Sequence, residues 1–581
     1  MCKLLKPSVE KPWLKFFSEE AREASMPRNT IYRHLRECSE GGLGDTALNY
    51  FGKKISYGKL LDEVDRAAGA FAAAGIKKGD IVAAATVTIP EMVYALYGLN
   101  KIGAAPLMLD PRTNATEVLR FVKETGAKIF IVIDLYYEVL KDVLFESGVE
   151  KIVVISADTS LPASIRFLKQ FKMPAPKIKT SDKVLTWTQF SATGKGVETE
   201  TAAYGDNDLA AVTLTGGTTG APKGVMLSND GFNAIAFDFK HCGVSYKRGQ
   251  RFMDIIPMFA SYGIVSSLHM PLTLGLEVVV IPKFDADKVG YYVKKYRPEH
   301  TLLVPAHYEK LMNSKEMAGG FDLSFFRTAG SGGDTMNAGL EAKLNSFLES
   351  RGCRYPLSQG YGMSEVSSAA SCCCNGNFKS LSVGYPLLTT TIGIFAPGTT
   401  DELDYGEEGE ICISGPSIML GYLNNKTETE NVIHRHPDGT LWVHSGDIGR
   451  MDSDGFVYIK GRIKRMITLF NGHKIFPTHI ESVLGHHPMV ASCAVVGVND
   501  TTHAQGQLTL AVVEAKEQTL ERLTAIKNEL YEMCRQELEG PAKPYDIIFV
   551  ESMPHTGMGK IDYLKLAEDY NNENRNETEA V

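Results

Sequence analysis

TLTGGTTGAPKGVMLS, residues 213–228, sets four glycines among threonines and places a lysine between Pro222 and Gly224. Glycines let backbone N–H groups turn toward one anion, threonine hydroxyls add donors, and the lysine adds a positive charge. An apolar run before the loop, Leu209–Leu214, predicts a buried strand, and residues 226–236 predict the start of a helix. The stretch therefore indicates a polyphosphate-binding loop, with a flexible surface loop as the alternative. The predicted contacts are Thr215, Gly216, Gly217, Thr218, Thr219, Gly220 and Lys223.

Two common motif classes are excluded by single residues. A P-loop of the kinase or GTPase type has a glycine directly before its lysine, whereas this chain has Pro222 there. The elbow of a serine hydrolase has a glycine two residues after its serine, and Val366 stands two residues after Ser364. Neither a Walker-type nucleotidase nor a serine hydrolase is expected.

A second loop, QGYGMSE at residues 359–365, carries side chains suited to a nucleotide. Tyr361 can stack on a flat base, Ser364 can donate to a phosphate, and Glu365 supplies a hard oxygen ligand for Mg²⁺. A solvated acid at a helix start is the alternative for Glu365. Further along, Asp447 is suited to ribose because one carboxylate accepts from two hydroxyls.

Composition limits the class of protein. The 581 residues exceed one core, so a large and a smaller domain are expected. The net charge of −8 argues against a nucleic-acid partner. Ten cysteines without a CxxC pair, three of them adjacent at 372–374, are interpreted as reduced packing thiols of a cytoplasmic protein. No secretory signal is visible, and Pro90 with Glu91 interrupts the apolar run 81–99, so no membrane-spanning helix is expected.

Alternating patterns predict the fold. Strands expected at 81–86, 103–109 and 128–134 alternate with helices at 58–74, 91–102 and 115–125, which indicates an α/β fold with a helix-covered parallel sheet. Residues 1–49 are expected to be a polar lead-in, 156–206 an irregular insertion, and the tail after Tyr570 disordered. The basic stretch 165–171 suits either a helix packed on its own domain, which is favoured, or peripheral contact with a membrane.

The loops 215–225 and 359–365 resemble those of the acyl-adenylate-forming superfamily, which includes acyl-CoA synthetases, luciferases and peptide-synthetase adenylation domains. The family's phosphate loop begins Thr-Ser-Gly-Ser-Thr-Gly, so this chain lacks one hydroxyl at Gly216. The stretches 75–82 and 101–112 also resemble acyl-CoA synthetases. The resemblance spans nearly the whole chain. It implies a large N-terminal domain (1–460) of parallel-rich sheets with a small β lobe, a hinge (461–464), and a mobile α+β C-terminal domain (465–581).

The resemblance also implies roles for further residues. Asp447 and Arg462 would contact the ribose, Lys464 would be the hinge, and Lys560 would bridge the substrate carboxylate and the α-phosphate during adenylation. The loop 329–334 would lie beside adenine. The implied set adds Gly333, Asp334, Tyr361 and Gly362 for ATP, Gly332, Ala260, Ser261, Tyr262 and Gly263 for the acyl group, and Gly472, His473 and Lys474 for CoA.

The implied reaction is that of an acid:CoA ligase using ATP, Mg²⁺ and CoA through an acyl-adenylate. An apolar acid, a medium- or long-chain fatty acid, is expected because residues 257–263 contain no charged side chain and Ala260 replaces the family's usual bulky gate residue. A peptide-synthetase domain would instead carry an acid for its substrate's amine. The alternatives are a ligase that loads a carrier protein and a non-catalytic adenylate-binding protein. A monomer or homodimer is expected.

Overall fold

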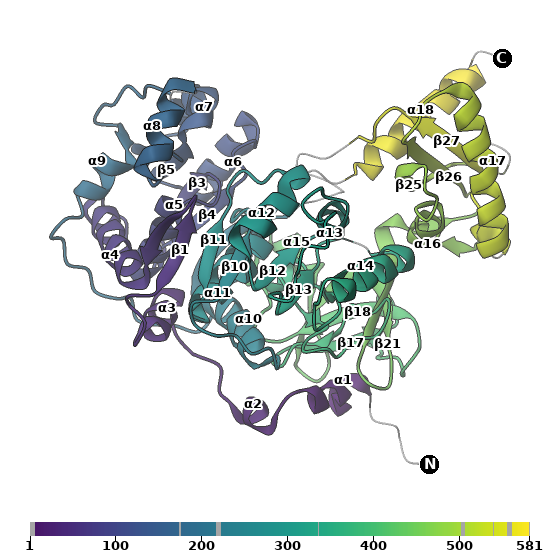
Figure 1. Cartoon of the computed structure of the whole chain (residues 1–581), viewed down its shortest axis with the longest axis horizontal. Helices are drawn as coiled ribbons and strands as arrows, with labels where there is room; N and C mark the ends of the chain where they lie inside the picture. Colours follow the sequence, from purple (N-terminus) through teal and green to yellow (C-terminus); the bar gives the residue numbers. More distant parts are fainter. Residues whose placement is uncertain are drawn as a thin grey trace.

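Two large sheets, covered by helices, form the body of the protein (Figure 1). The computed structural model describes residues 6–172, 176–215, 222–334, 336–500, 503, 506–538, 540–554 and 561–579. One sheet has eight strands in the order β19-β9-β8-β4-β3-β5-β6-β7, and the other has nine in the order β16-β15-β14-β13-β12-β10-β11-β1-β2. Most neighbouring strands are parallel, with antiparallel pairs toward the edges, so the predicted α/β class is confirmed.

The eight-stranded sheet comes mainly from the first third of the chain. Its strands are β3 (Ile81–Ala85), β4 (Ala105–Leu109), β5 (Ile129–Ile133), β6 (Lys151–Ile155), β7 (Val184–Thr186), β8 (Leu209–Leu214), β9 (Gly224–Ser228) and β19 (Gly421–Tyr422). Its helices are α4 (Tyr57–Ala73), α5 (Pro90–Lys101), α6 (Ala115–Thr125), α7 (Asp134–Glu146), α8 (Ala163–Lys172), α9 (Trp187–Ala192) and α10 (Asn229–His241).

The nine-stranded sheet collects most of the middle of the chain. Its strands are β1 (Thr46–Tyr50), β2 (Lys53–Ser56), β10 (Arg251–Asp254), β11 (Glu277–Val280), β12 (His300–Leu303), β13 (Thr328–Ser331), β14 (Ser358–Tyr361), β15 (Ser371–Cys372) and β16 (Tyr385–Pro386). The helices of this region are α3 (Ile31–Ser39), α11 (Met270–Thr273), α12 (Val289–Tyr296), α13 (Pro305–Met312) and α14 (Ala338–Ser350).

Helix α5 lies in the core that joins the two sheets. All of its residues are buried, as expected for a helix that is apolar around most of its circumference. It shares one hydrophobic cluster with Val82 of β3 and Val278 of β11, which belong to different sheets. Gly98 lets it approach α4, because a Cβ there would lie 2.9 Å from the Cβ of Ala67. The two sheets therefore form one rigid platform for the loops at their strand ends.

Two smaller units complete the fold. The β lobe consists of β17 (Thr391–Phe395), β18 (Gly409–Ser414), β20 (Ile433–Arg435), β21 (Leu441–Met451) and β22 (Val457–Arg462). The C-terminal unit, drawn in yellow-green in Figure 1, holds the hairpin β23 (Ile467–Thr468) and β24 (Lys474–Ile475), and a three-stranded sheet. The strands of that sheet are β25 (Val490–Asn499), β26 (Gln507–Ala515) and β27 (Asp546–Val550). Its helices are α16 (Pro477–Leu484), α17 (Leu520–Glu537) and α18 (Tyr563–Glu579).

Three sequence-based expectations were wrong. Residues 226–228 belong to β9 and pair antiparallel with β8, and the helix begins only at Asn229 because Ser228 caps it. The insertion 156–206 contains α8, β7 and α9, and β7 extends the parallel sheet beside β6. The tail is helical to Glu579, because Leu566 and Tyr570 of α18 pack in the cluster that contains β25 residues.

The expectations about the adjacent cysteines, membrane-spanning helices and helix α8 have different outcomes. Cysteines 372–374 are buried free thiols, as predicted for packing residues. Among the described residues, no helix is both long and apolar enough to cross a membrane. In α8, Ile165 is 36% and Phe167 61% exposed, so this helix does not bury its whole apolar face. Peripheral membrane contact remains a prediction.

A buried carboxylate ties α10 to the entrance of the β lobe. Asp238 is 0% exposed and accepts hydrogen bonds from the backbone N–H (2.8 Å) and hydroxyl (2.9 Å) of Thr389. Burial raises the pKa of Asp238 to about 7, against the lowering effect of these two hydrogen bonds. Because the folded-state pKa is raised, the stability linked to this group is present at low pH and is lost as the pH rises through about 7.

We expect the Asp238→Asn variant to lose less stability than the wild type between about pH 5 and pH 8. The neutral amide has no charge to desolvate, whereas the wild type loses on the order of 2–3 kcal/mol of unfolding free energy over this range. Denaturant unfolding at both pH values measures the difference. Thr389→Ser keeps both donors, so this control should show the same dependence of stability on pH as the wild type. Equal pH dependence in Asp238→Asn and the wild type would contradict the assignment to Asp238.

Candidate active site

Asp447 links the β lobe to the nine-stranded sheet. It lies on β21 of the β lobe and is 4% exposed. Its Oδ2 accepts a hydrogen bond from the Tyr361 hydroxyl at the end of β14 (2.6 Å), and its Oδ1 accepts from Nε–H of Arg462 on β22 (2.9 Å). Burial and the Asp447 charge raise the pKa of Tyr361, so the phenol stays protonated as a donor. Three predicted nucleotide residues are thus joined directly.

A second cluster links Glu365 to Lys223. The Tyr422 hydroxyl donates to Oε1 of Glu365 (2.7 Å), and the Lys223 ammonium lies 5.0 Å from the centre of the Tyr422 ring. Lys223 also pairs with Glu428, and this hydrogen bond lowers the pKa of that carboxyl. The hydroxyl of Thr215 accepts from the Lys223 backbone N–H (3.2 Å), which fixes both ends of the phosphate loop.

The Glu365 carboxylate fits a hard cation. It is 8% exposed, and its Oε2 takes no hydrogen bond from the part of the chain that the structure describes. Oxygen ligands of this kind suit Mg²⁺, which keeps most of its water ligands and bridges phosphate oxygens. Against the lowering effect of burial, the charges of Asp447 and, more weakly, of Glu365 raise the pKa of Arg462.

The predicted acyl segment follows β10. Ser261 donates its hydroxyl hydrogen to the hydroxyl of Ser364 (3.1 Å), which joins this segment to the loop 359–365. Residues Tyr262–His269 form a π-helix, a rare turn geometry that is frequent at functional sites. Gly263 has no room for a side chain, since a Cβ there would lie 2.0 Å from the Pro257 carbonyl oxygen.

Glycines in the loops 329–334 and 359–365 allow neighbouring segments to approach closely. A Cβ added to Gly332 would lie 3.6 Å from the Tyr262 hydroxyl and 3.3 Å from the Gly360 carbonyl oxygen. A Cβ at Gly362 would clash with the Ser368 carbonyl oxygen at 1.9 Å. Ala260 lies half-buried at the start of the same segment. The sequence-predicted acyl residues Ala260, Ser261, Tyr262, Gly263 and Gly332 thus lie on neighbouring segments.

The remaining predicted residues that the structure describes lie in exposed turns and an exposed hairpin. Lys464 is exposed in a 3-10 turn after β22, and its charge acts on Glu428. Gly333 (φ +82°) and Asp334 form an exposed turn, and the Asp334 charge acts on Tyr563 of the C-terminal unit. Gly472, His473 and Lys474 lie in the exposed β23–β24 hairpin, where Gly472 N–H donates to the Leu469 carbonyl (2.9 Å). Their assigned roles stay predictions.

Several predicted residues lie outside the described residues. They are Gly216, Gly217, Thr218, Thr219 and Gly220 of the phosphate loop, and Lys560.

Sequence reasoning missed the residues that support the motifs. Tyr422 and Glu428 contact Glu365 and Lys223 from positions 57 and 205 residues away. Glu410 and His444 form a buried pair, with 2.9 Å between Oε2 of Glu410 and Nδ1 of His444. No local spacing signals such contacts, although Tyr422 stands in the short turn 420–422 and His444 only three residues before Asp447.

Comparison with known proteins gives consistent matches over the chain. The profile of the AMP-binding enzyme family matches residues 35–423, and that of the AMP-binding enzyme C-terminal domain matches 479–560. The chain is 28% identical over 571 residues to a long-chain-fatty-acid–CoA ligase of Bacillus subtilis, covering 96% of this chain and 98% of that protein. It is also 28% identical over 547 residues to a probable 4-coumarate–CoA ligase of Dictyostelium discoideum, covering 93% and 94%.

A solved structure shares the fold. ATP-bound MatB from Rhodopseudomonas palustris matches with a TM-score of 0.78 at 23% identity, covering 93% of this chain and 99% of that one.

We expect Tyr422→Phe to weaken binding of Mg·ATP about tenfold, because a hydrogen bond to a buried carboxylate contributes on the order of 1.5–3 kcal/mol. Titration calorimetry with ATP at several Mg²⁺ concentrations measures the loss. Tyr405→Phe is the matched control, since its hydroxyl donates to Glu10 (2.8 Å) on the surface and its removal should leave binding unchanged. Equal effects of the two variants would contradict the assignment of Tyr422.

Proposed function

Because the chain belongs to the AMP-binding enzyme family and is an AMP-forming acid:CoA ligase that uses ATP, Mg²⁺ and CoA, we propose that its acid is a medium- or long-chain fatty acid. The observation that carries this proposal is the apolar acyl segment. Residues 257–263 contain no charged side chain, and Met258 and Phe259 are buried there. Such a surface suits an alkyl chain and offers no partner for a substrate amine.

The small residues at the start of the segment support the same substrate class. Ala260 is small and half-buried, so it would leave room where a bulkier side chain would narrow an entrance, and Gly263 keeps the turn tight. The near full-length similarity to a long-chain-fatty-acid–CoA ligase agrees with an alkyl substrate. Similarity of equal identity to a coumarate ligase makes an aryl acid the second candidate, and the Tyr262 hydroxyl near Gly332 offers a polar partner for a phenolic group.

In the first step, the acid's carboxylate attacks the α-phosphorus of ATP and pyrophosphate leaves. The protein's contribution to such a reaction is positioning and charge stabilisation rather than covalent chemistry. We assign phosphate binding to Thr215 and Lys223, and ribose binding to Asp447 and Arg462. Glu365 would hold Mg²⁺, which neutralises the phosphate charge when bound. Ser364 would donate to the α-phosphate.

In the second step, the CoA thiolate attacks the acyl-adenylate carbonyl and AMP leaves. We assign the change between the steps to rotation about Lys464, a hinge-type motion in which a few residues absorb the backbone change. Rotation would withdraw Lys560 and bring the hairpin with Gly472, His473 and Lys474 to the site. The proposed boundaries are 1–460, 461–464 and 465–581.

A panel of acids tests the substrate class. We expect acid-dependent pyrophosphate release to be greatest with saturated acids of medium or long chain, because each buried methylene contributes about 0.8 kcal/mol of binding. Acetate and amino acids should give on the order of a hundredfold lower kcat/KM. A preference for coumarate would favour the aryl alternative, and a preference for an amino acid would overturn the proposal.

Lys560→Ala separates the two half-reactions. We expect acid-dependent ATP–pyrophosphate exchange to fall by on the order of 10²–10³-fold, because a preorganised cation stabilises the charge that develops at the α-phosphate. Conversion of a supplied acyl-adenylate to acyl-CoA should stay near the wild-type rate. Lys565→Ala, on the exposed surface of α18, is the control. Equal loss of both half-reactions in Lys560→Ala would refute the assignment.

A further inference from the structure

The strand that carries Asp447 contains a bulge at this residue. Glu410 of β18 pairs with Ile448 of β21, whereas Cys412, two positions later, pairs with His444. Three residues, 445–447, therefore lie opposite the single residue Ile411. Gly446 has φ +72°, a conformation that favours glycine. Bulges of this kind redirect side chains and are frequent beside active sites.

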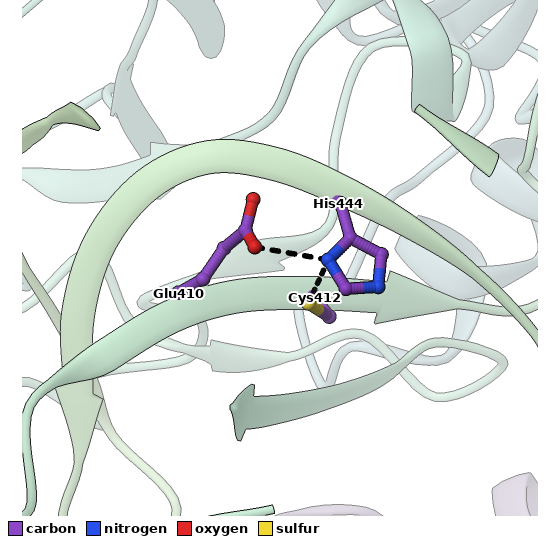
Figure 2. Close-up of side chains that lie close together, drawn as sticks. All are labelled: Glu410, Cys412 and His444. Atoms are coloured by element: carbon purple, nitrogen blue, oxygen red, sulfur yellow. Dashed lines mark hydrogen bonds and ion pairs between the residues drawn. The ribbon is translucent and has the colours of Figure 1, made fainter. Parts of the chain in front are cut away.

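Glu410 closes this bulge from the neighbouring strand. Its Oε1 accepts a hydrogen bond from Gly446 N–H (3.0 Å), and its Oε2 accepts from Nδ1–H of His444 (2.9 Å; Figure 2). Within the bulge, the Ser445 hydroxyl donates to the Ile411 carbonyl (2.6 Å) and accepts from Asp447 N–H (3.0 Å). The backbone on either side of Asp447 is thus held by side chains.

Burial makes this arrangement restrictive. Glu410 is 6% and His444 8% exposed, so water does not readily replace a lost partner. Burial alone would raise the pKa of Glu410, yet the hydrogen bond and charge of His444 hold it below its usual value. On the far side of the ring, His444 Nε2 lies 3.0 Å from His436 Nε2, which fixes the ring orientation. Leaving either partner of such a buried pair unsatisfied is costly.

The same side chains also include a set of metal-ligand types. Donor atoms of Glu410, Cys412 and His444 lie within 4.8 Å of one another, with Cys412 Sγ 3.4 Å from His444 Nδ1 (Figure 2). However, both Glu410 oxygens already accept hydrogen bonds, and His436 faces the other ring nitrogen of His444, away from the thiol. Within the described ranges no fourth protein donor completes a closed tetrahedral site, and the Glu410 oxygens are already engaged, so hydrogen bonding explains the cluster better.

We propose that Glu410 and His444 are positioning residues that hold the β21 bulge so that the Asp447 carboxylate faces the ribose of ATP. The inference rests on the ribose role proposed above for Asp447. Glu410 acts on the nucleotide only through the backbone of 445–447 and does not touch it.

The test compares ATP with 2′,3′-dideoxy-ATP, which lacks the hydroxyls that Asp447 would bind. For Glu410→Ala we expect the KM for ATP to rise about tenfold, the KM for the dideoxy nucleotide to change less than about twofold, and kcat to stay near wild type. Glu410→Gln keeps one acceptor and should give an intermediate rise. Glu402→Gln is the control, because Glu402 accepts from Ser8 (2.8 Å) elsewhere in the β lobe.

The Asp447→Asn variant separates failure of this inference from failure of the proposed function. If Asp447→Asn leaves the ratio of the two KM values unchanged, the ribose role itself is wrong. If the KM for dideoxy-ATP divided by the KM for ATP falls toward one in Asp447→Asn but not in the Glu410 variants, the positioning role is overturned. A parallel rise of the KM values for both nucleotides in the Glu410 variants would indicate a general structural role and would also overturn the positioning role. Stoichiometric zinc in the purified protein, lost in Cys412→Ser, would overturn the hydrogen-bonded assignment.

Discussion

The geometry of the site depends on one buried carboxylate shared by two sheets. Asp447 accepts from Tyr361, at the end of a strand in the nine-stranded sheet, and from Arg462 in the β lobe. Burying a carboxylate is costly unless its oxygens are satisfied, so the two sheets are held in one relative position. The Asp238–Thr389 contact at the entrance to the lobe acts in the same direction. The nucleotide residues are therefore placed by the packing of the lobe as much as by their own loops.

The fold was predictable where the local pattern is strong. The buried run Leu209–Leu214 and the amphipathic helix Ala115–Thr125 have the predicted bounds, because burial of one face or of both faces leaves a clear periodicity. Residues 226–228 were misassigned because a run this short carries no period, and pairing with β8 on one side and β19 on the other decides its conformation. The polar tail of α18 was missed for a related reason: its helix is anchored by contacts with β25, which composition does not reveal.

The candidate site likewise contains residues that the sequence predicts and supporting residues that it does not. Motif residues such as Tyr361, Asp447 and Arg462 stand in recognisable patterns, and the structure joins them directly. Their supports do not stand in such patterns. Tyr422 reaches Glu365 across 57 residues, and the closure of the bulge by Glu410 depends on a register shift between two strands. A pairing irregularity of this kind is a property of the assembled sheet, so one sequence read alone carries no sign of it.

The ion pair between Lys223 and Glu428 gives the predicted phosphate loop an anionic partner from a distant part of the chain. Before nucleotide arrives, the lysine's charge is already compensated, so the loop need not recruit inorganic ions from solution. With Lys223 as the proposed phosphate contact, entry of a triphosphate would be an exchange, in which Glu428 yields its cation to a more highly charged ligand. In that exchange, a ligand that brings several negative charges together would displace Glu428 more readily than a small monovalent anion would.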